Sequence, residues 1–142
     1  MKRLALMLCA MLLWVVSFGT GRAEEEIDFD LSAFNGGMTY AQMIQVCNAP
    51  ESYVGKVFRV QGKFNYSETR EMAKIIFSDK SGCCELAMMF RTEQPLVYPE
   101  DYPALYNDIT ITARLATDGE DPDSPCWLAD AVLEWEKEGI AP

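Results

Sequence analysis

Cysteine is the residue type whose chemistry stands out most in this sequence. One of the five cysteines, Cys9, lies in an apolar N-terminal segment, and the other four are Cys47, Cys83, Cys84 and Cys126. An even number of cysteines is typical of disulfide formation in an oxidising compartment. The chain has no histidine, which excludes Ser-His and Cys-His nucleophilic pairs and His-ligated metal sites. The sequence therefore favours a binding or structural role over catalysis, and no catalytic residue is predicted.

Three interpretations of the four cysteines remain open. A disulfide from Cys126 to Cys83 or Cys84 would close about 43 residues and contribute about 4 kcal/mol of stability, and a second bond could involve Cys47. A four-thiolate zinc site fits the number of cysteines but not their spacing, because zinc ligands usually come as C-x2-4-C pairs. In the third interpretation, one cysteine is buried and inert and the others are unpaired or partly paired.

The adjacent pair Cys83-Cys84 raises a separate question. Neighbouring residues on a strand point to opposite faces, so both sulfurs could bind one ion only at a bulge. A disulfide between them would be strained and easily reduced, which would suit a redox switch. The flanking Asp79 and Glu85 could serve as acid and base, but a turn residue and a strand-surface residue are the more ordinary interpretations.

The N-terminal segment has the three parts of a secretory signal peptide. Lys2 and Arg3 precede an apolar run from Leu4 to Val16, and Gly21 and Ala23 are the small residues before a cleavage site. The run is shorter than the roughly 20 apolar residues of a membrane span. Residues 1–23 are therefore predicted to be removed on export to the periplasm or the medium, with no stable membrane insertion afterwards. Cys9 lies inside the apolar run, which disfavours a lipoprotein anchor.

Acidic residues dominate the expected mature chain. Without Lys2, Arg3 and Arg22, nine basic residues face 22 acidic ones, a net charge of −13. Proteins that bind nucleic acids neutralise phosphates with clustered Lys and Arg. The charge therefore argues against nucleic acid and anionic membranes as partners, and its ordinary consequence is solubility. The expected partner is an unknown small ligand or protein.

Short strands are predicted after a helix over 40–47 that Thr39 caps and Pro50 ends. Alternating apolar residues indicate strands over 57–66, 73–77, 84–90, 109–115 and 126–135. Gly62 interrupts the first, where a bulge or bend is expected. This pattern predicts a mainly β protein with a small five-stranded OB-like barrel and a short N-terminal helix, and a small β-sandwich is the alternative. The expected parts are a signal peptide (1–23), a flexible acidic leader (24–37), the barrel (38–136) and a C-terminal tail (137–142).

Four motifs in order also resemble a known group. They are Tyr53-Val54-Gly55-Lys56, Val60-Gln61-Gly62-Lys63-Phe64, Cys83-Cys84 and Tyr98-Pro99-Glu100-Asp101-Tyr102-Pro103. Their order and spacing, over roughly residues 38–136, resemble small exported bacterial OB-like proteins of unknown function. They are also similar to the soluble domain of a permease-associated family of unknown function with a comparable vicinal cysteine pair. The resemblance implies a fold and an exported location, but no reaction.

The expected barrel topology predicts where the cysteines lie. Its third and fifth strands are parallel neighbours, so Cys83, Cys84 and Cys126, at the starts of these strands, should be close together. Cys47, on the helix before the first strand, should lie at the same end.

The candidate ligand or partner surface consists of three tyrosines, Tyr66, Tyr98 and Tyr102. Their rings could instead simply plug the barrel mouth. The predicted function is an exported, non-enzymatic binding or structural module without a cofactor, stabilised by cysteines. The alternative is a thiol-based redox or metal-binding protein, with zinc as the metal.

Overall fold

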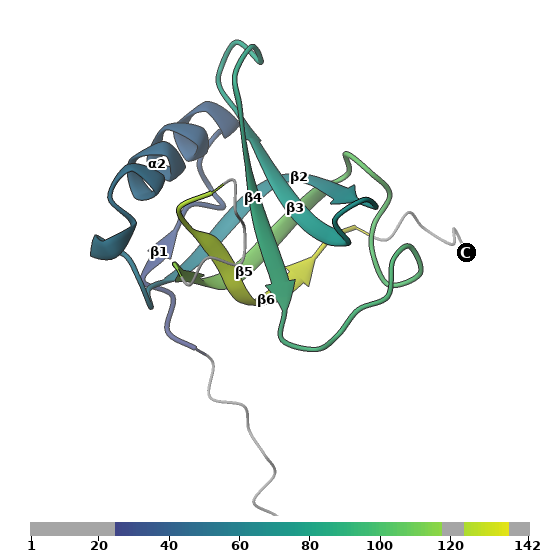
Figure 1. Ribbon diagram of the computed structural model, residues 1–142. Coiled ribbons are helices and arrows are strands. Elements are labelled where there is room, and N and C mark those ends of the chain that lie inside the picture. Colours follow the sequence, from purple (N-terminus) through teal and green to yellow (C-terminus); the bar gives the residue numbers. More distant parts are fainter. Residues whose placement is uncertain (1–24, 118–123, 137–142) are drawn as a thin grey trace, which may run out of the picture.

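Alternating apolar residues form five strands that close into a barrel (Figure 1). In the computed structural model, which describes residues 25–117 and 124–136, these strands are β2 (Val57–Ser67), β3 (Met72–Ser78), β4 (Glu85–Thr92), β5 (Asp108–Ala116) and β6 (Trp127–Glu134). Their order is β2-β3-β4-β6-β5, and a β2–β5 pairing closes the sheet. All neighbours are antiparallel except β4 and β6, which are parallel. This arrangement confirms the predicted five-stranded barrel and excludes the sandwich.

The long strand β2 forms a corner of the barrel at Gly62. It pairs with β5 from Val57 to Lys63 and with β3 from Lys63 to Ser67. A Cβ atom on Gly62 would lie 2.7 Å from both the Ile75 Cγ1 and the Ile76 carbonyl oxygen. Gly62 is therefore required because the backbone of β3 crosses too closely for any side chain.

Side chains on the inner face of each strand fill the barrel. They include Phe58, Val60, Phe64, Ile75, Phe77, Met88, Phe90, Ile109, Ile111, Leu115 and Leu128, all at most 2% exposed. Outward positions on β5 such as Thr110 and Thr112 are only partly buried. This alternation, which the sequence predicted for residues 109–115, sets the register of the strands.

The helix α2 (Gly36–Asn48) covers one end of the barrel. Its N-cap is Asn35, whose side chain accepts a hydrogen bond from the Met38 N–H, rather than the predicted Thr39. Thr39 is instead buried one turn into the helix, and its hydroxyl donates to the Leu31 carbonyl. Met43 and Val46 join the core. A short 3-10 turn, η2 (Pro50–Ser52), follows and leads into β2.

Part of the leader expected to be flexible is an ordered strand. Phe29–Asp30, the strand β1, pairs in parallel with Phe58 and Arg59 of β2. Asp28 fixes this strand, because its carboxylate accepts the Val57 N–H and pairs with Lys56. The predicted signal peptide, Cys9 and the C-terminal tail over 137–142 lie outside the described residues.

Candidate functional site

The structure arranges the four cysteines as two pairs instead of one cluster. The sulfur atoms of Cys47 and Cys126 lie 3.3 Å apart, and those of Cys83 and Cys84 lie 3.5 Å apart. All four thiols are free, so no sulfurs are at bonding distance in the described part of the chain. The predicted bond from Cys126 to Cys83 or Cys84 is thus replaced by a close contact between Cys126 and Cys47. A four-thiolate zinc site is not formed.

A stagger between the parallel strands explains this separation. Phe90 of β4 is level with Leu128 of β6, so Met88, two residues earlier, is level with Cys126. The Cys47 sulfur also contacts Met88. Cys84 comes four residues before Met88, about 13 Å away at 3.3 Å per residue. Strands in a closed barrel are offset in this way by its shear. The prediction that parallel neighbours start at the same level was therefore wrong.

Cys83 and Cys84 lie on a hairpin between β3 and β4 that rises above the barrel (Figure 1). Asp79 and Gly82 shape this turn. The Asp79 N–H donates to the Cys84 carbonyl (2.9 Å), and the Gly82 N–H donates to the Asp79 carbonyl (3.1 Å). Gly82 has a φ of 71°, a conformation that glycine adopts without strain. Both cysteines precede β4, so the alternation of a strand does not separate their side chains.

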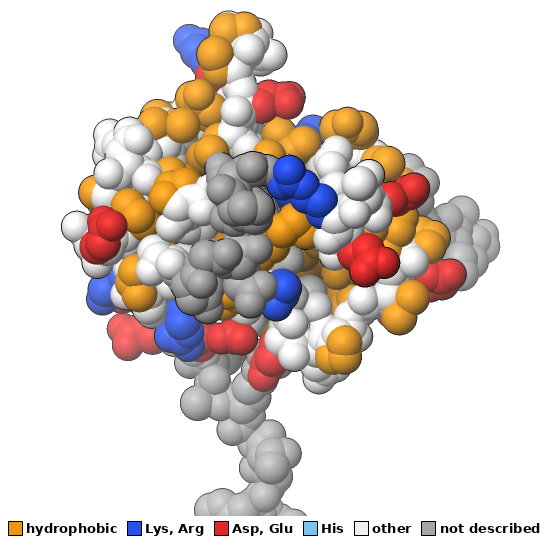
Figure 2. Space-filling view, in the orientation of Figure 1, with side chains coloured by type: hydrophobic (Ala, Val, Ile, Leu, Met, Phe, Trp, Pro, Cys, Tyr) orange, Lys and Arg blue, Asp and Glu red, His pale blue; other side chains and the backbone are white. Residues whose placement is uncertain are grey.

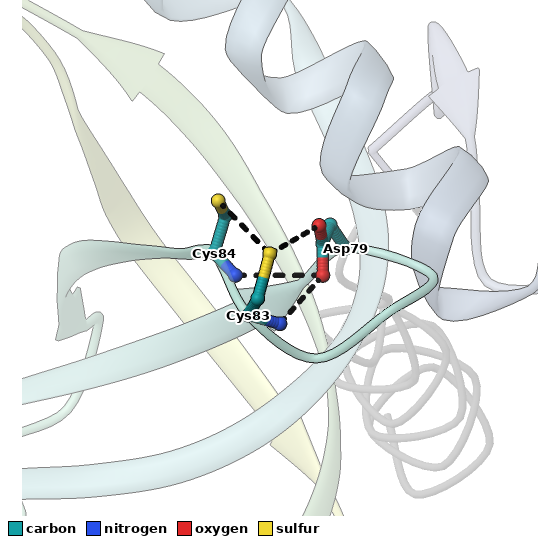
Figure 3. Close-up of side chains that lie close together, drawn as sticks. All are labelled: Asp79, Cys83 and Cys84. Carbon is teal, nitrogen blue, oxygen red and sulfur yellow. Dashed lines mark hydrogen bonds between the residues drawn. The ribbon is translucent and has the colours of Figure 1, made fainter.

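Asp79 faces the cysteine pair (Figure 3). Its Oδ1 accepts the N–H groups of Cys83 (3.0 Å) and Cys84 (3.4 Å), and its Oδ2 lies 3.4 Å from the Cys83 sulfur. One carboxylate oxygen and both sulfurs lie within 4.8 Å of one another, the only such group of three or more Cys, Asp or Glu ligand atoms among the residues described. Ser81 donates its hydroxyl to the Asp79 Oδ2 at 2.8 Å. We call Asp79, Cys83 and Cys84 the hairpin cluster.

The hydrogen bonds of the hairpin cluster set its protonation. The Ser81 hydroxyl, and more weakly the thiol and amides of the cysteines, lower the pKa of Asp79, which therefore stays ionised. The hydrogen bond between the thiols, with smaller contributions from desolvation and the Asp79 charge, raises the pKa of Cys84. The cluster thus consists of a carboxylate beside a thiol that keeps its proton at neutral pH.

Two of the three ligand separations in the hairpin cluster match those around a tetrahedral zinc ion. Bond lengths of about 2.3 Å to sulfur and 2.1 Å to oxygen place tetrahedral ligands about 3.8 Å apart for two sulfurs and about 3.6 Å apart for sulfur and oxygen. The observed separations of 3.5 Å and 3.4 Å differ from these values by a few tenths of an ångström. Both cysteines are exposed at the tip of the hairpin. An ion could therefore enter from solvent and keep a fourth ligand position open.

The second pair lies in a different environment, under α2. Cys126 is 1% exposed, and Cys47 is half-buried in the last turn of the helix. The thiol-thiol hydrogen bond lowers the pKa of Cys47, and the same bond, together with burial, raises the pKa of Cys126. Solvent therefore reaches Cys47 more easily than its partner.

The predicted tyrosine surface packs mainly on itself and on the core. Tyr66 and Tyr98 are stacked with ring centroids 3.9 Å apart, and Tyr102 stacks on Phe64 at 5.2 Å. The Tyr102 ring also lies 6.5 Å from that of Phe90, inside the barrel mouth. These contacts support the plugging role that was the alternative for this loop.

The sequence pattern identifies the cysteine pair and predicts an ordinary turn role for Asp79. It is indeed a turn residue, and this role brings its carboxylate to the sulfurs. The spacing Asp-Lys-Ser-Gly-Cys-Cys was the available signal, since Asp and Gly together favour a tight turn that folds back on its own N–H groups. Glu85, the other flanking acid, lies in β4 and is not part of the cluster.

Within residues 25–117 and 124–136, no helix is both long and apolar enough to cross a membrane. On the face in Figure 2, Lys and Arg side chains are interspersed with acidic ones and form no continuous basic patch.

No protein-family model matches the sequence, and the curated proteins contain no significant match. The resemblance to exported OB-like proteins with a vicinal cysteine pair therefore stays a prediction.

Proposed function

We propose that this protein is an exported, non-enzymatic barrel that reversibly binds a thiophilic metal ion at the hairpin cluster. Zinc is the ion that we expect it to prefer. The observation that carries the proposal is the convergence of two exposed sulfurs and one carboxylate oxygen within 4.8 Å. The signal-peptide pattern of residues 1–23 supports export. The barrel serves as the rigid support of the hairpin.

The number of ligands favours reversible binding over a structural role. Structural zinc sites are closed by four protein ligands, whereas sites with three keep a position open for water or another molecule. The hairpin cluster supplies three ligands and protrudes from the barrel. A partner protein or a small molecule can supply the fourth ligand, which is the geometry required for passing an ion on.

The two neighbouring cysteines are also poorly placed to form a disulfide with each other in an oxidising compartment. Adjacent Cα atoms are about 3.8 Å apart across a trans peptide, whereas disulfides usually join Cα atoms 4.4–6.8 Å apart. A bond between Cys83 and Cys84 would be strained and readily reduced. The pair is therefore available as a dithiol for an ion.

Asp79 has a double role in this proposal. Its Oδ1 holds the turn through the amides of the two cysteines, and its Oδ2 faces the Cys83 thiol. Zinc replaces the thiol proton between sulfur and carboxylate, because cysteine binds metals as the thiolate. The carboxylate then neutralises part of the charge of the ion.

The test is a zinc titration of the reduced mature chain against a chromophoric chelator. The expected result is one ion per chain, with binding lost in the C83S/C84S variant and weakened in Asp79→Asn. The matched control is C47A/C126A, which removes the other pair and keeps the zinc site. Circular dichroism establishes that each variant is folded.

Two results would overturn the proposal. One is equal zinc binding by wild type and C83S/C84S, which would place the ion elsewhere. The other is that the reduced, folded wild-type chain takes no zinc from the chelator at zinc concentrations that leave the chelator unsaturated, where the competition can detect binding to the protein.

A further inference from the structure

We propose that Cys47 and Cys126 form a disulfide that joins the last turn of α2 to the start of β6, while Cys83 and Cys84 stay a dithiol. This goes beyond metal binding at the hairpin cluster and rests on only one part of the proposed function, the export of the chain. The two pairs thus have different fates in the same oxidising compartment.

The geometry of the Cys47–Cys126 pair requires little change for a bond to form. The sulfurs lie 3.3 Å apart, and a disulfide bond is about 2.05 Å long. The sulfurs must therefore approach by about 1.2 Å, the difference between this bond length and the observed separation. Cys47 is the penultimate residue of α2, and Cys126 immediately precedes β6. Residues at the ends of elements can make such a movement without breaking a helix or a strand.

Sequence separation distinguishes this pair from the other one. Cys47 and Cys126 are 79 positions apart, so no constraint from a shared peptide bond opposes their crosslink. Cys83 and Cys84 share a peptide bond, which keeps their Cα atoms closer together than a relaxed disulfide requires. An oxidant that can oxidise both pairs therefore leaves the first as the stable bond.

The reaction is a thiol–disulfide exchange with an oxidised dithiol oxidoreductase or another small disulfide of the exported compartment. The Cys47 thiolate attacks one sulfur of the oxidant, and the other sulfur leaves as a thiolate, giving a mixed disulfide. The Cys126 thiolate then attacks the Cys47 sulfur, which breaks the mixed disulfide and releases, as a thiolate, the oxidant sulfur that Cys47 had attacked. Two electrons pass to the oxidant, which becomes a dithiol, and the two protons of the protein thiols are released or taken up by it.

The order of attack follows from exposure. Cys47 is half-buried and reachable by an incoming oxidant, whereas Cys126 is 1% exposed. The hydrogen bond from the Cys126 thiol stabilises the Cys47 thiolate and lowers its pKa. Cys47 is therefore the attacking residue, and Cys126 resolves the mixed disulfide.

The crosslink also fixes a helix that flanks the metal site. Tyr40, seven residues before Cys47, lies about 10 Å along the helix at 1.5 Å per residue. Gly37, one turn before Tyr40, lies directly against the hairpin, since a Cβ atom on Gly37 would be 3.0 Å from the Lys80 Cβ. A covalent bond at the end of α2 holds this neighbour of the site against the barrel.

The experiment maps the cysteines of the protein from the exported fraction of its host. The sample is denatured with a chelator and N-ethylmaleimide, digested without reductant and analysed by mass spectrometry. We expect a crosslinked peptide pair that contains Cys47 and Cys126, with the maleimide on Cys83 and Cys84. In the matched C83S/C84S variant the crosslink stays and the maleimide labelling disappears.

A second arm separates the pairing from export. The purified, reduced mature chain is oxidised with oxidised glutathione and mapped in the same way. A crosslink in this arm but not in the exported sample overturns the disulfide in the cell, and leaves the zinc site as proposed. Absence of the protein from the exported fraction overturns export, and with it that part of the proposed function. Maleimide on Cys47 and Cys126 in both arms, or a crosslink from Cys126 to Cys83 or Cys84, overturns the pairing itself.

Discussion

Reduction of the Cys47–Cys126 crosslink should lower the thermal stability of the barrel by a large and calculable amount. A disulfide stabilises mainly because it restricts the unfolded chain, and the restriction grows with the length of the closed loop. The two cysteines are 79 positions apart. A loop of about 80 residues corresponds to about 4.5 kcal/mol at 25 °C on the chain-entropy model.

The change in melting temperature follows from the entropy of unfolding. At about 2.1 cal/mol/K per residue, a chain of about 119 residues has an unfolding entropy near 0.25 kcal/mol/K. Dividing the loss of stability by this entropy gives a decrease of about 18 °C. The native contacts around α2 are expected to change little, because both sulfurs are already in contact in the reduced structure.

The assay is thermal unfolding followed by circular dichroism, with and without reductant, in the C83S/C84S background. This background removes the exposed pair, so only Cys47 and Cys126 can respond. The C47A/C126A variant in the same background is the control, and its melting temperature should not depend on reductant. If the reductant shifts both proteins equally, the chain-entropy reasoning for this crosslink is refuted.

Three further predictions concern the corner of the barrel, the N-terminal strand and the metal site. Gly62→Ala should destabilise the protein by about 1–3 kcal/mol in urea unfolding, because its Cβ would meet the Ile75 side chain and the backbone of β3 at 2.7 Å. Hydrogen bonds from Val57 and Lys56 lower the pKa of Asp28 below its ordinary 3.8, so its stabilising contribution is complete above that pH and is lost as the pH falls through the lower, folded-state value. Asp28→Asn should therefore lower the melting temperature at pH 7, and the gap to wild type should close in strong acid. Zinc affinity should rise by up to about 100-fold per pH unit while zinc displaces two thiol protons. The raised pKa of Cys84 should extend this rise into the alkaline range in the chelator titration.

Each of these three predictions has an outcome that contradicts it. An unchanged urea midpoint for Gly62→Ala would mean that β3 moves away at no cost. A constant difference between Asp28→Asn and wild type from pH 7 to strong acid would remove ionisation as the cause. A zinc affinity that is independent of pH would exclude thiolate ligands.

Local patterns in the sequence predicted the strands because their physical cause is local. Alternating apolar residues over 109–115 can bury one face only as a strand, and β5 occupies Asp108–Ala116 as expected. Gly62 was predicted to mark a bend, and the close approach of β3 is its cause. The N-cap was misplaced at Thr39, because Asn35 can cap equally well and the burial of Thr39 depends on a contact with Leu31. The sequence also does not predict that part of the leader over 24–37 is an ordered strand, because β1 forms only through its pairing with β2.

The sequence by itself determined that the cysteines are the residues with distinctive chemistry and that the chain is mainly β, with a five-stranded barrel favoured over a sandwich. The number of cysteines, the absence of histidine and the alternation of apolar residues are all properties of composition and short-range order. Only the tertiary structure decided which sulfurs meet. The stagger between β4 and β6 places Cys126 under α2 beside Cys47 and leaves Cys83 and Cys84 with Asp79 at the tip of the hairpin. That offset depends on how the whole sheet closes, and no short segment of the sequence contains it.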